Sequence, residues 1–234
     1  MKWLNAITRR RPALDPPLAE ALAGYRALEI PDLATPLAIQ RGVVVDVEST
    51  GLDPFTDRLV SIGAVVVHGG LARLSQSFEV VLRPAGAIGQ RSIVLHGIGE
   101  SAQRAGRDPA AGLVNFLTFA GKAPLIAFHA DFDRTLIERT AANVLCMKPA
   151  NTWLDLALLA PAVFPRHASR HRALDDWTKL FGIDNPARHN AAADAFATAQ
   201  LLLVVLAAAR AQNVSTWNEL IALQRAQRWL GVRH

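Results

Sequence analysis

A short apolar run that ends in two acids constrains this chain more than any other feature. Residues 42–48 read GVVVDVE, and such a run of valines indicates a strand buried within a sheet. Asp46 and Glu48 are two residues apart, so in a strand their side chains project from the same face. Acids there cost free energy unless a partner compensates them. For an isolated D-x-E the alternative is a strand that emerges into solvent.

The rest of the chain predicts an α/β domain with a mixed sheet, because a meander of strands is followed by strands alternating with helices. Strands are expected over 58–68, 71–82 and 124–129. Helices are expected over 18–28, 110–120, 132–145, 173–181, 191–212 and 216–230. Residues 153–159 continue the same domain.

The 234 residues fit one domain with short appendages. Residues 1–40 are rich in proline and form an N-terminal extension. We expect residues 41–212 to form the main domain and residues 213–234 to form a C-terminal helix packed on it. Thr216 and Glu219 have the spacing of a capping box at the start of this helix.

Charge and cysteine content narrow the class of protein. The 25 Lys and Arg outnumber the 20 Asp and Glu, and the pI near 10.1 suits a polyanionic partner such as nucleic acid. The single cysteine, Cys146, excludes an internal disulfide and a cysteine-based zinc site. The apolar run 201–209 is short for a bilayer span, so we expect a cytoplasmic protein and no membrane.

Three further side chains have positions that packing alone does not explain. Asp133 falls in the first turn of the helix that follows a buried strand. Asp194 lies among alanines near the start of the longest helix, where a cation is the natural partner of a buried carboxylate. His189 precedes it by five residues, an offset of about 140° on a helix. We therefore expect His189 in the preceding loop, with Asn190 as the N-cap.

Carboxylates without cysteines favour Mg²⁺ or Mn²⁺, which prefer oxygen ligands. Two such ions could hold an attacking water and a leaving oxygen in line across a phosphodiester. A nearby imidazole could take the proton from that water at neutral pH.

Three segments resemble the motifs of the DEDDh branch of the exonuclease superfamily, which includes the epsilon proofreading subunit of bacterial DNA polymerase III. Residues 46–52 (DVESTGL) are similar to its first motif, residues 130–133 (ADFD) to its second and residues 189–195 (HNAAADA) to its third. Residues 96–98 (HGI) are similar to a substrate loop found between the first two. Only forty residues follow Asp194, so we expect a free-standing relative of that subunit.

The resemblance implies a ribonuclease H-like fold, with a five-stranded mixed sheet flanked by helices, and a 3′→5′ exonuclease acting on single-stranded DNA. It implies that two divalent ions are bound by four carboxylates, those of Asp46, Glu48, Asp133 and Asp194, and that His189 is the general base. It also implies contacts to the terminal nucleotide from Thr50, Gly51, Leu52, His96, Ile98 and Phe132.

Several alternatives stay open. Phe132 is as well explained by core packing as by stacking on a base. Phe128-His129 replaces the usual His-Asn of the second motif, and the basic stretch 166–172 could steer a phosphate backbone or form a solvated loop. RNA or short oligonucleotides are alternative substrates, and a catalytically silent nucleic-acid-binding or scaffold module is the alternative class. No polymerase or repair partner can be named from the sequence.

Overall fold

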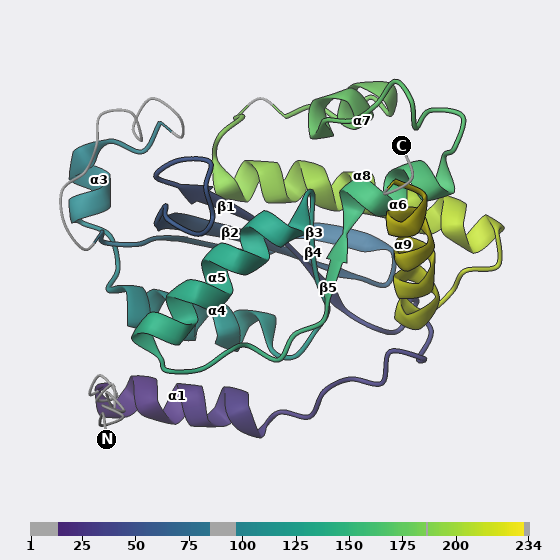
Figure 1. The fold of residues 1–234 in the computed structure, drawn as a ribbon. Helices are drawn as coiled ribbons and strands as arrows, with labels where there is room; N and C mark the ends of the chain where they lie inside the picture. The colour runs from purple at the N-terminus through teal and green to yellow at the C-terminus, as the bar shows by residue number, and fades with distance from the viewer. Residues whose placement is uncertain (1–13, 85–96, 186, 232–234) are drawn as a thin grey trace, which may run out of the picture.

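The computed structural model describes residues 14–84, 97–185 and 187–231. Its centre is a five-stranded sheet in the order β3-β2-β1-β4-β5 (Figure 1). The strands are β1 (Gly42–Ser49), β2 (Leu59–His68), β3 (Leu71–Val81), β4 (Leu125–Ala127) and β5 (Trp153–Asp155). β1, β2 and β3 pair antiparallel, whereas β4 is parallel to both β1 and β5. The predicted five-stranded mixed sheet is therefore confirmed.

Helices cover both faces of the sheet. They are α1 (Pro16–Ala27), α3 (Glu100–Arg104), α4 (Pro109–Ala120), α5 (Ala130–Val144), α6 (Leu156–Val163), α7 (Leu174–Leu180), α8 (Ala191–Ala211) and α9 (Trp217–Gly231). Side-chain alternation in β1 supplies both layers: Val43, Val45 and Val47 pack with α1, α4 and α5, whereas Val44 packs with α6, α8 and α9. Figure 1 shows α4 and α5 side by side on one face of the sheet and α8 on the other face.

Local signals explain where several helices begin. Asp15 and Asp108 cap α1 and α4, and each is followed by a proline at the first helical position. Asn190 caps α8 through its side-chain oxygen, as predicted. The capping box at Thr216 and Glu219 is also confirmed, because each side chain accepts the other residue's backbone N–H.

The expected elements differ from the structure mainly at their ends. The strand predicted over 124–129 is only three residues long, and the helix after it begins at Ala130, two residues earlier than predicted. Residues 153–159 divide into the short edge strand β5 and the start of α6. Three residues carry too little periodicity for a strand to be predicted there.

Two terminal helices pack on this core. Leu22 and Tyr25 of α1 are buried, and the Tyr25 hydroxyl donates to Asn151 Oδ1 at 2.9 Å. Asn151 in turn donates to the carbonyls of Gly121 and Ala123. At the other end of the chain, α9 packs against α6 and β5.

Helix α8 is apolar because it lies in the core. By length and composition it alone, among the described helices, could cross a membrane, but half of its most apolar window is buried in the fold. It packs against β1, β2 and β3. We therefore attribute its apolar composition to core packing.

The first turn of α8 approaches the sheet at a glycine. Gly63 of β2 lies opposite Asp46 of β1, and a Cβ on Gly63 would lie 2.1 Å from the carbonyl carbon of Ala191. No side chain fits in that space, so only glycine lets the helix backbone rest on the strand. Asn190 adds a polar link here, because its amide donates to Glu79 Oε1 of β3 at 3.0 Å.

Substitution of Gly63 by alanine should therefore destabilise the fold. We expect a loss of about 3 kcal/mol, the upper end for overpacking, because the obstructing atoms belong to a backbone that cannot rotate away. Urea denaturation measures it. The matched control is Gly24→Ala in α1, where nothing lies within 4 Å and the added methyl should stabilise by about 0.5–1 kcal/mol. Equal stability of Gly63→Ala and the unmodified protein would contradict this account.

Candidate active site

Three carboxylates meet where α8 crosses the sheet. Asp46 and Glu48 project from β1 toward α8, and Asp194 lies three residues after Ala191, one helical turn from the contact with Gly63. One carboxylate oxygen from each of Asp46, Glu48 and Asp194 lies within 4.8 Å of the other two. The backbone contact at Gly63 thus brings carboxylates from β1 and α8 into one cluster.

A fourth carboxylate approaches from the end of β4. Asp133 lies in the first turn of α5 and is only 5% exposed. Its Oδ1 accepts the backbone N–H of Val47, which lies between Asp46 and Glu48, at 3.1 Å. β4 has ended before this point, so the free N–H of Val47 is available to a side chain. The structure thus brings Asp46, Glu48 and Asp194 into one cluster and places Asp133 beside it, on the Val47 N–H.

Crowding and burial make this cluster electrostatically unfavourable without a cation. Burial raises the pKa of Asp46 well above its usual range, and the neighbouring charges of Asp133, Asp194 and Glu48 raise it further. Burial, followed by the charge of Asp194, raises the pKa of Glu48 to about 7. Burial also raises the pKa of Asp133, although backbone hydrogen bonds oppose that effect.

Such a cluster fits divalent cations. Hard oxygen ligands converge on one point, and a cation there would offset the repulsion that otherwise favours protonation. Asp46, Glu48 and Asp194 could hold one ion together, and Asp133 adds a carboxylate beside Asp46. The donor set contains no sulfur, which favours Mg²⁺ or Mn²⁺ over softer metals.

Asp194 is held by the loop before α8. Its Oδ2 accepts the backbone N–H of His189 at 3.0 Å, and its Oδ1 accepts from the side chains of Asn185 and Arg188. Arg188 also forms an ion pair with Asp175 of α7, with 3.0 Å between Nε and Oδ1. Sequence reasoning missed Arg188, because an arginine in a polar loop has no feature that indicates a partner.

His189 lies in the loop before α8, as predicted. Its backbone adopts the left-handed region, with φ of 64°, and its side chain is exposed. Within the described part of the chain, its ring has no hydrogen-bond partner, so it is held near the cluster through its backbone alone.

The predicted substrate contacts lie in different surroundings. Thr50 donates to Asp57 Oδ1 at 2.8 Å, and a Cβ on Gly51 would lie 2.5 Å from Asp57 Oδ2, so Asp57 shapes this turn. Leu52 is 83% exposed and free to meet a ligand.

The structure describes two of the other three predicted contacts, Phe132 and Ile98. Phe132 is half-buried and packs against the core cluster beneath β1, which favours core packing. Ile98 is half-buried, and its carbonyl accepts from Gln103 Nε2 at 2.8 Å. His96 lies outside the described residues.

Comparisons with known proteins agree with this arrangement. The model of the exonuclease family matches residues 43–202, a range that contains all four carboxylates and His189. The chain belongs to the exonuclease family. The family that the three motifs predicted is thereby confirmed.

Sequence relatives of this exonuclease domain are parts of longer proteins. A DNA polymerase III subunit epsilon-like protein from Rhodobacter capsulatus is 33% identical over 190 residues, which cover 80% of this chain and 27% of the relative. A PolC-type DNA polymerase III from Thermotoga maritima is 29% identical over 161 residues, 69% of this chain and 11% of that protein. The chain therefore spans only a small part of these relatives.

Solved structures share the fold. E. coli exonuclease I in complex with a dT13 oligonucleotide aligns with a TM-score of 0.63 at 18% identity, covering 74% of this chain and 42% of that one. A second structure of an exonuclease I aligns with a TM-score of 0.63 over 72% of this chain and 41% of that one, at 19% identity.

Arg188 should compete with a divalent cation for Asp194. We expect Arg188→Gln to bind Mn²⁺ up to about tenfold more tightly, because its charge no longer neutralises the cluster and its guanidinium no longer occupies Asp194. Calorimetric titration of the metal-free protein measures this affinity. The charge-matched control is Arg170→Gln, in the exposed loop before α7, which should bind Mn²⁺ like the unmodified protein. Weaker or unchanged binding by Arg188→Gln would exclude the competition.

Proposed function

We propose that this chain is a metal-dependent 3′→5′ exonuclease that hydrolyses phosphodiester bonds at the 3′ end of single-stranded DNA and releases nucleoside 5′-monophosphates. The observation that carries the proposal is the cluster of Asp46, Glu48 and Asp194, with Asp133 beside it on the Val47 N–H, within an exonuclease-family domain. These carboxylates would be expensive to keep together in a protein that did not use them.

Asp46, Glu48, Asp133 and Asp194 would hold two divalent ions, Mg²⁺ or Mn²⁺. When bound, such ions lower the pKa of water and neutralise charge on a phosphate during hydrolysis. The chain's own contribution is to fix the carboxylates: α8 is held by its backbone contact with Gly63, and Asp133 by the Val47 N–H. E. coli exonuclease I, which shares the fold, has been solved with a bound zinc ion.

His189 would act as the general base. An imidazole has an ordinary pKa of about 6.5, so it can accept the proton of an attacking water at neutral pH. Its backbone N–H fixes its Cα beside Asp194, and its exposed ring is free to turn toward a substrate.

The terminal nucleotide would lie against Thr50, Gly51 and Leu52, with His96 and Ile98 as further contacts, whereas Phe132 would serve in core packing. Single-stranded DNA is favoured because exonuclease I has been solved with dT13 and dA16 oligonucleotides. In the basic stretch, Arg166, Arg170 and Arg172 are exposed, whereas His167 and His171 pack on each other, with 5.4 Å between ring centroids. The exposed arginines would attract the phosphate backbone.

Replacing Asp46 with alanine should abolish hydrolysis and leave the protein folded. We expect a rate loss of at least about a thousandfold, because a shared ligand of the ions is lost. The fold should persist, since the removed group is repelled by its neighbours. The assay follows a 5′-labelled single-stranded DNA with Mg²⁺ or Mn²⁺, and again with EDTA.

A descending ladder that EDTA abolishes is the expected result for the unmodified protein and for the control Glu20→Ala, an exposed acid on α1. A folded and active Asp46→Ala protein would contradict the assignment of Asp46 as a ligand that hydrolysis requires. Matched single-stranded RNA in parallel reactions identifies the preferred sugar, and inactivity on both polymers would favour a silent binding module.

Replacing His189 with alanine should slow the chemical step and leave metal affinity nearly unchanged. The expected loss in kcat is about 10²–10⁴-fold, the range for general acid–base catalysis. Single-turnover kinetics give the rate, and calorimetric titration with Mn²⁺ gives the affinity. Severe loss of metal binding would contradict the role of His189 as a base, because its side chain is not among the proposed ligands.

A further inference from the structure

A concave site lies between α9 and the edge strand β5, apart from the carboxylate cluster. The cleft has a volume of about 550 Å³, within the usual range for pockets that bind small ligands. It is lined by Leu33, Thr152, Trp153, Asn218, Ile221, Ala222, Gln224, Arg225 and Arg228. Among the described residues that line it, two are arginines and none is acidic.

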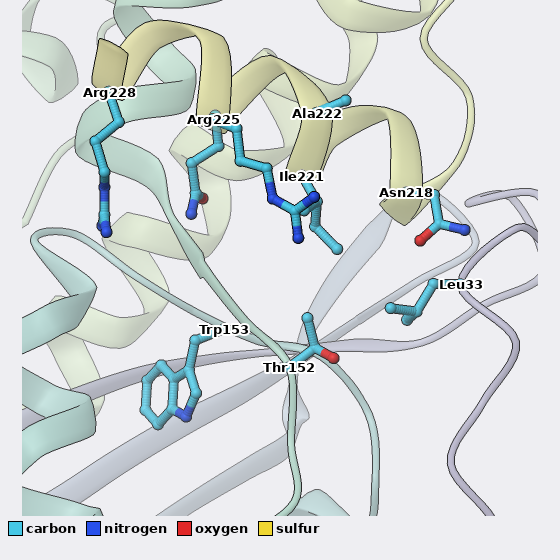
Figure 2. Close-up of a pocket in the computed structure, with 9 residues that line it drawn as sticks. Leu33, Thr152, Trp153, Asn218, Ile221, Ala222, Arg225 and Arg228 are labelled. Carbon is cyan, nitrogen blue, oxygen red and sulfur yellow. The ribbon is translucent and has the colours of Figure 1, made fainter. Parts of the chain in front are cut away.

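Both arginines that line this cleft come from α9. Arg225 and Arg228 are three residues apart on α9 and therefore share a face. Figure 2 shows both side chains extending from the helix toward the chain at Thr152 and Trp153. In the part of the chain that the structure describes, Arg225 has no ion-pair partner.

The ion pair that Arg228 forms is exposed to solvent. It pairs with Asp131 at 3.2 Å, but the two side chains are 52% and 71% exposed, and exposed pairs contribute little to stability. A guanidinium carries five N–H donors, so this pair leaves most of its donors available to an anion.

The rest of the lining suits a nucleotide. Trp153 is half-buried and packs against the core cluster beneath β1, and it also lines the cleft, where base–aromatic stacking would tolerate any base sequence. Thr152 and Asn218 add a hydroxyl and an amide that can bond to phosphate or sugar oxygens. The Trp153 Nε1 is shielded from solvent and, among the described residues, has no hydrogen-bond partner.

Two elements, α5 and β5, connect the cleft to the region of the carboxylate cluster. Asp131, the partner of Arg228, is two residues before Asp133 in the first turn of α5. Asp155 ends β5, directly after the lining residue Trp153 and Leu154, and accepts the backbone N–H of His129, the N-cap of α5. The start of α5 therefore separates the cleft from the carboxylates.

We propose that this cleft binds a phosphate and an adjoining base of the single strand, upstream of the nucleotide held at the carboxylates. The proposal rests on the proposed function, because it gives the same strand a second anchor. Arg225 and Arg228 bind the phosphate, and Trp153 stacks on the base. The cleft then raises the affinity for long strands without taking part in hydrolysis.

Binding without hydrolysis tests the proposal directly. Fluorescence anisotropy of a labelled single-stranded 20-mer in EDTA compares the unmodified protein with Arg225→Gln, Trp153→Phe and the charge-matched control Arg26→Gln on α1. We expect Arg225→Gln to weaken binding at least about fivefold and to reduce the salt slope by about one, as for a lost phosphate contact. Trp153→Phe should weaken binding less, because a phenyl ring still stacks. Arg26→Gln should bind like the unmodified protein.

A small substrate distinguishes the role of the cleft from the role of the carboxylates. The p-nitrophenyl ester of thymidine 5′-monophosphate has no upstream strand, so the unmodified protein and Arg225→Gln should hydrolyse it equally with Mn²⁺. Failure of every protein to hydrolyse either substrate would reject the proposed function, while binding in EDTA still reports on the cleft. Equal affinity of Arg225→Gln and the unmodified protein for the 20-mer would overturn the proposal. Equal loss in Arg26→Gln would also overturn it, because it would indicate a general charge effect.

Discussion

The contact between the start of α8 and Gly63 is the constraint on which the site depends. A row of residues crosses the sheet here, from Glu79 in β3 through Gly63 in β2 to Asp46 in β1. The helix rests on the middle of this row, and its cap Asn190 bonds to Glu79. Asp194 follows one turn later and so lies beside Asp46. A side chain at position 63 would lift the helix and separate the carboxylates.

The packing that positions the carboxylates also destabilises their charged forms. Apolar strands and an apolar helix shield Asp46 and Asp133 from water, and shielding raises the pKa of both carboxyls. The loop before α8 offsets part of this cost by aiming Arg188, Asn185 and a backbone N–H at Asp194. The fold thus fixes the carboxylates close together and pairs one of them, Asp194, with the guanidinium of Arg188.

The sequence was sufficient to predict a mixed sheet and the longer helices, but not β5 or α6, and it selected four carboxylates that the fold places near one another. Asp46 and Asp194 were recognisable because acids in apolar elements need a reason, and because their motifs come in a known order. The role of Gly63 could not be predicted, since a glycine in a strand does not reveal that the backbone of a helix distant in sequence packs against it. Arg225 and Trp153 were also beyond reach, because the cleft exists only once α9 packs beside β5. Tertiary contacts decide these features, and local patterns do not encode them.

Anomalous diffraction from crystals soaked in Mn²⁺ tests the central claim most directly, because it locates the ions independently of activity. The account predicts manganese peaks within coordination distance of Asp46, Glu48 and Asp194, with Asp133 joining a second ion. It also predicts that the Arg188 guanidinium has moved off Asp194. Absence of manganese at these carboxylates, in crystals where the four groups lie together, would contradict the account.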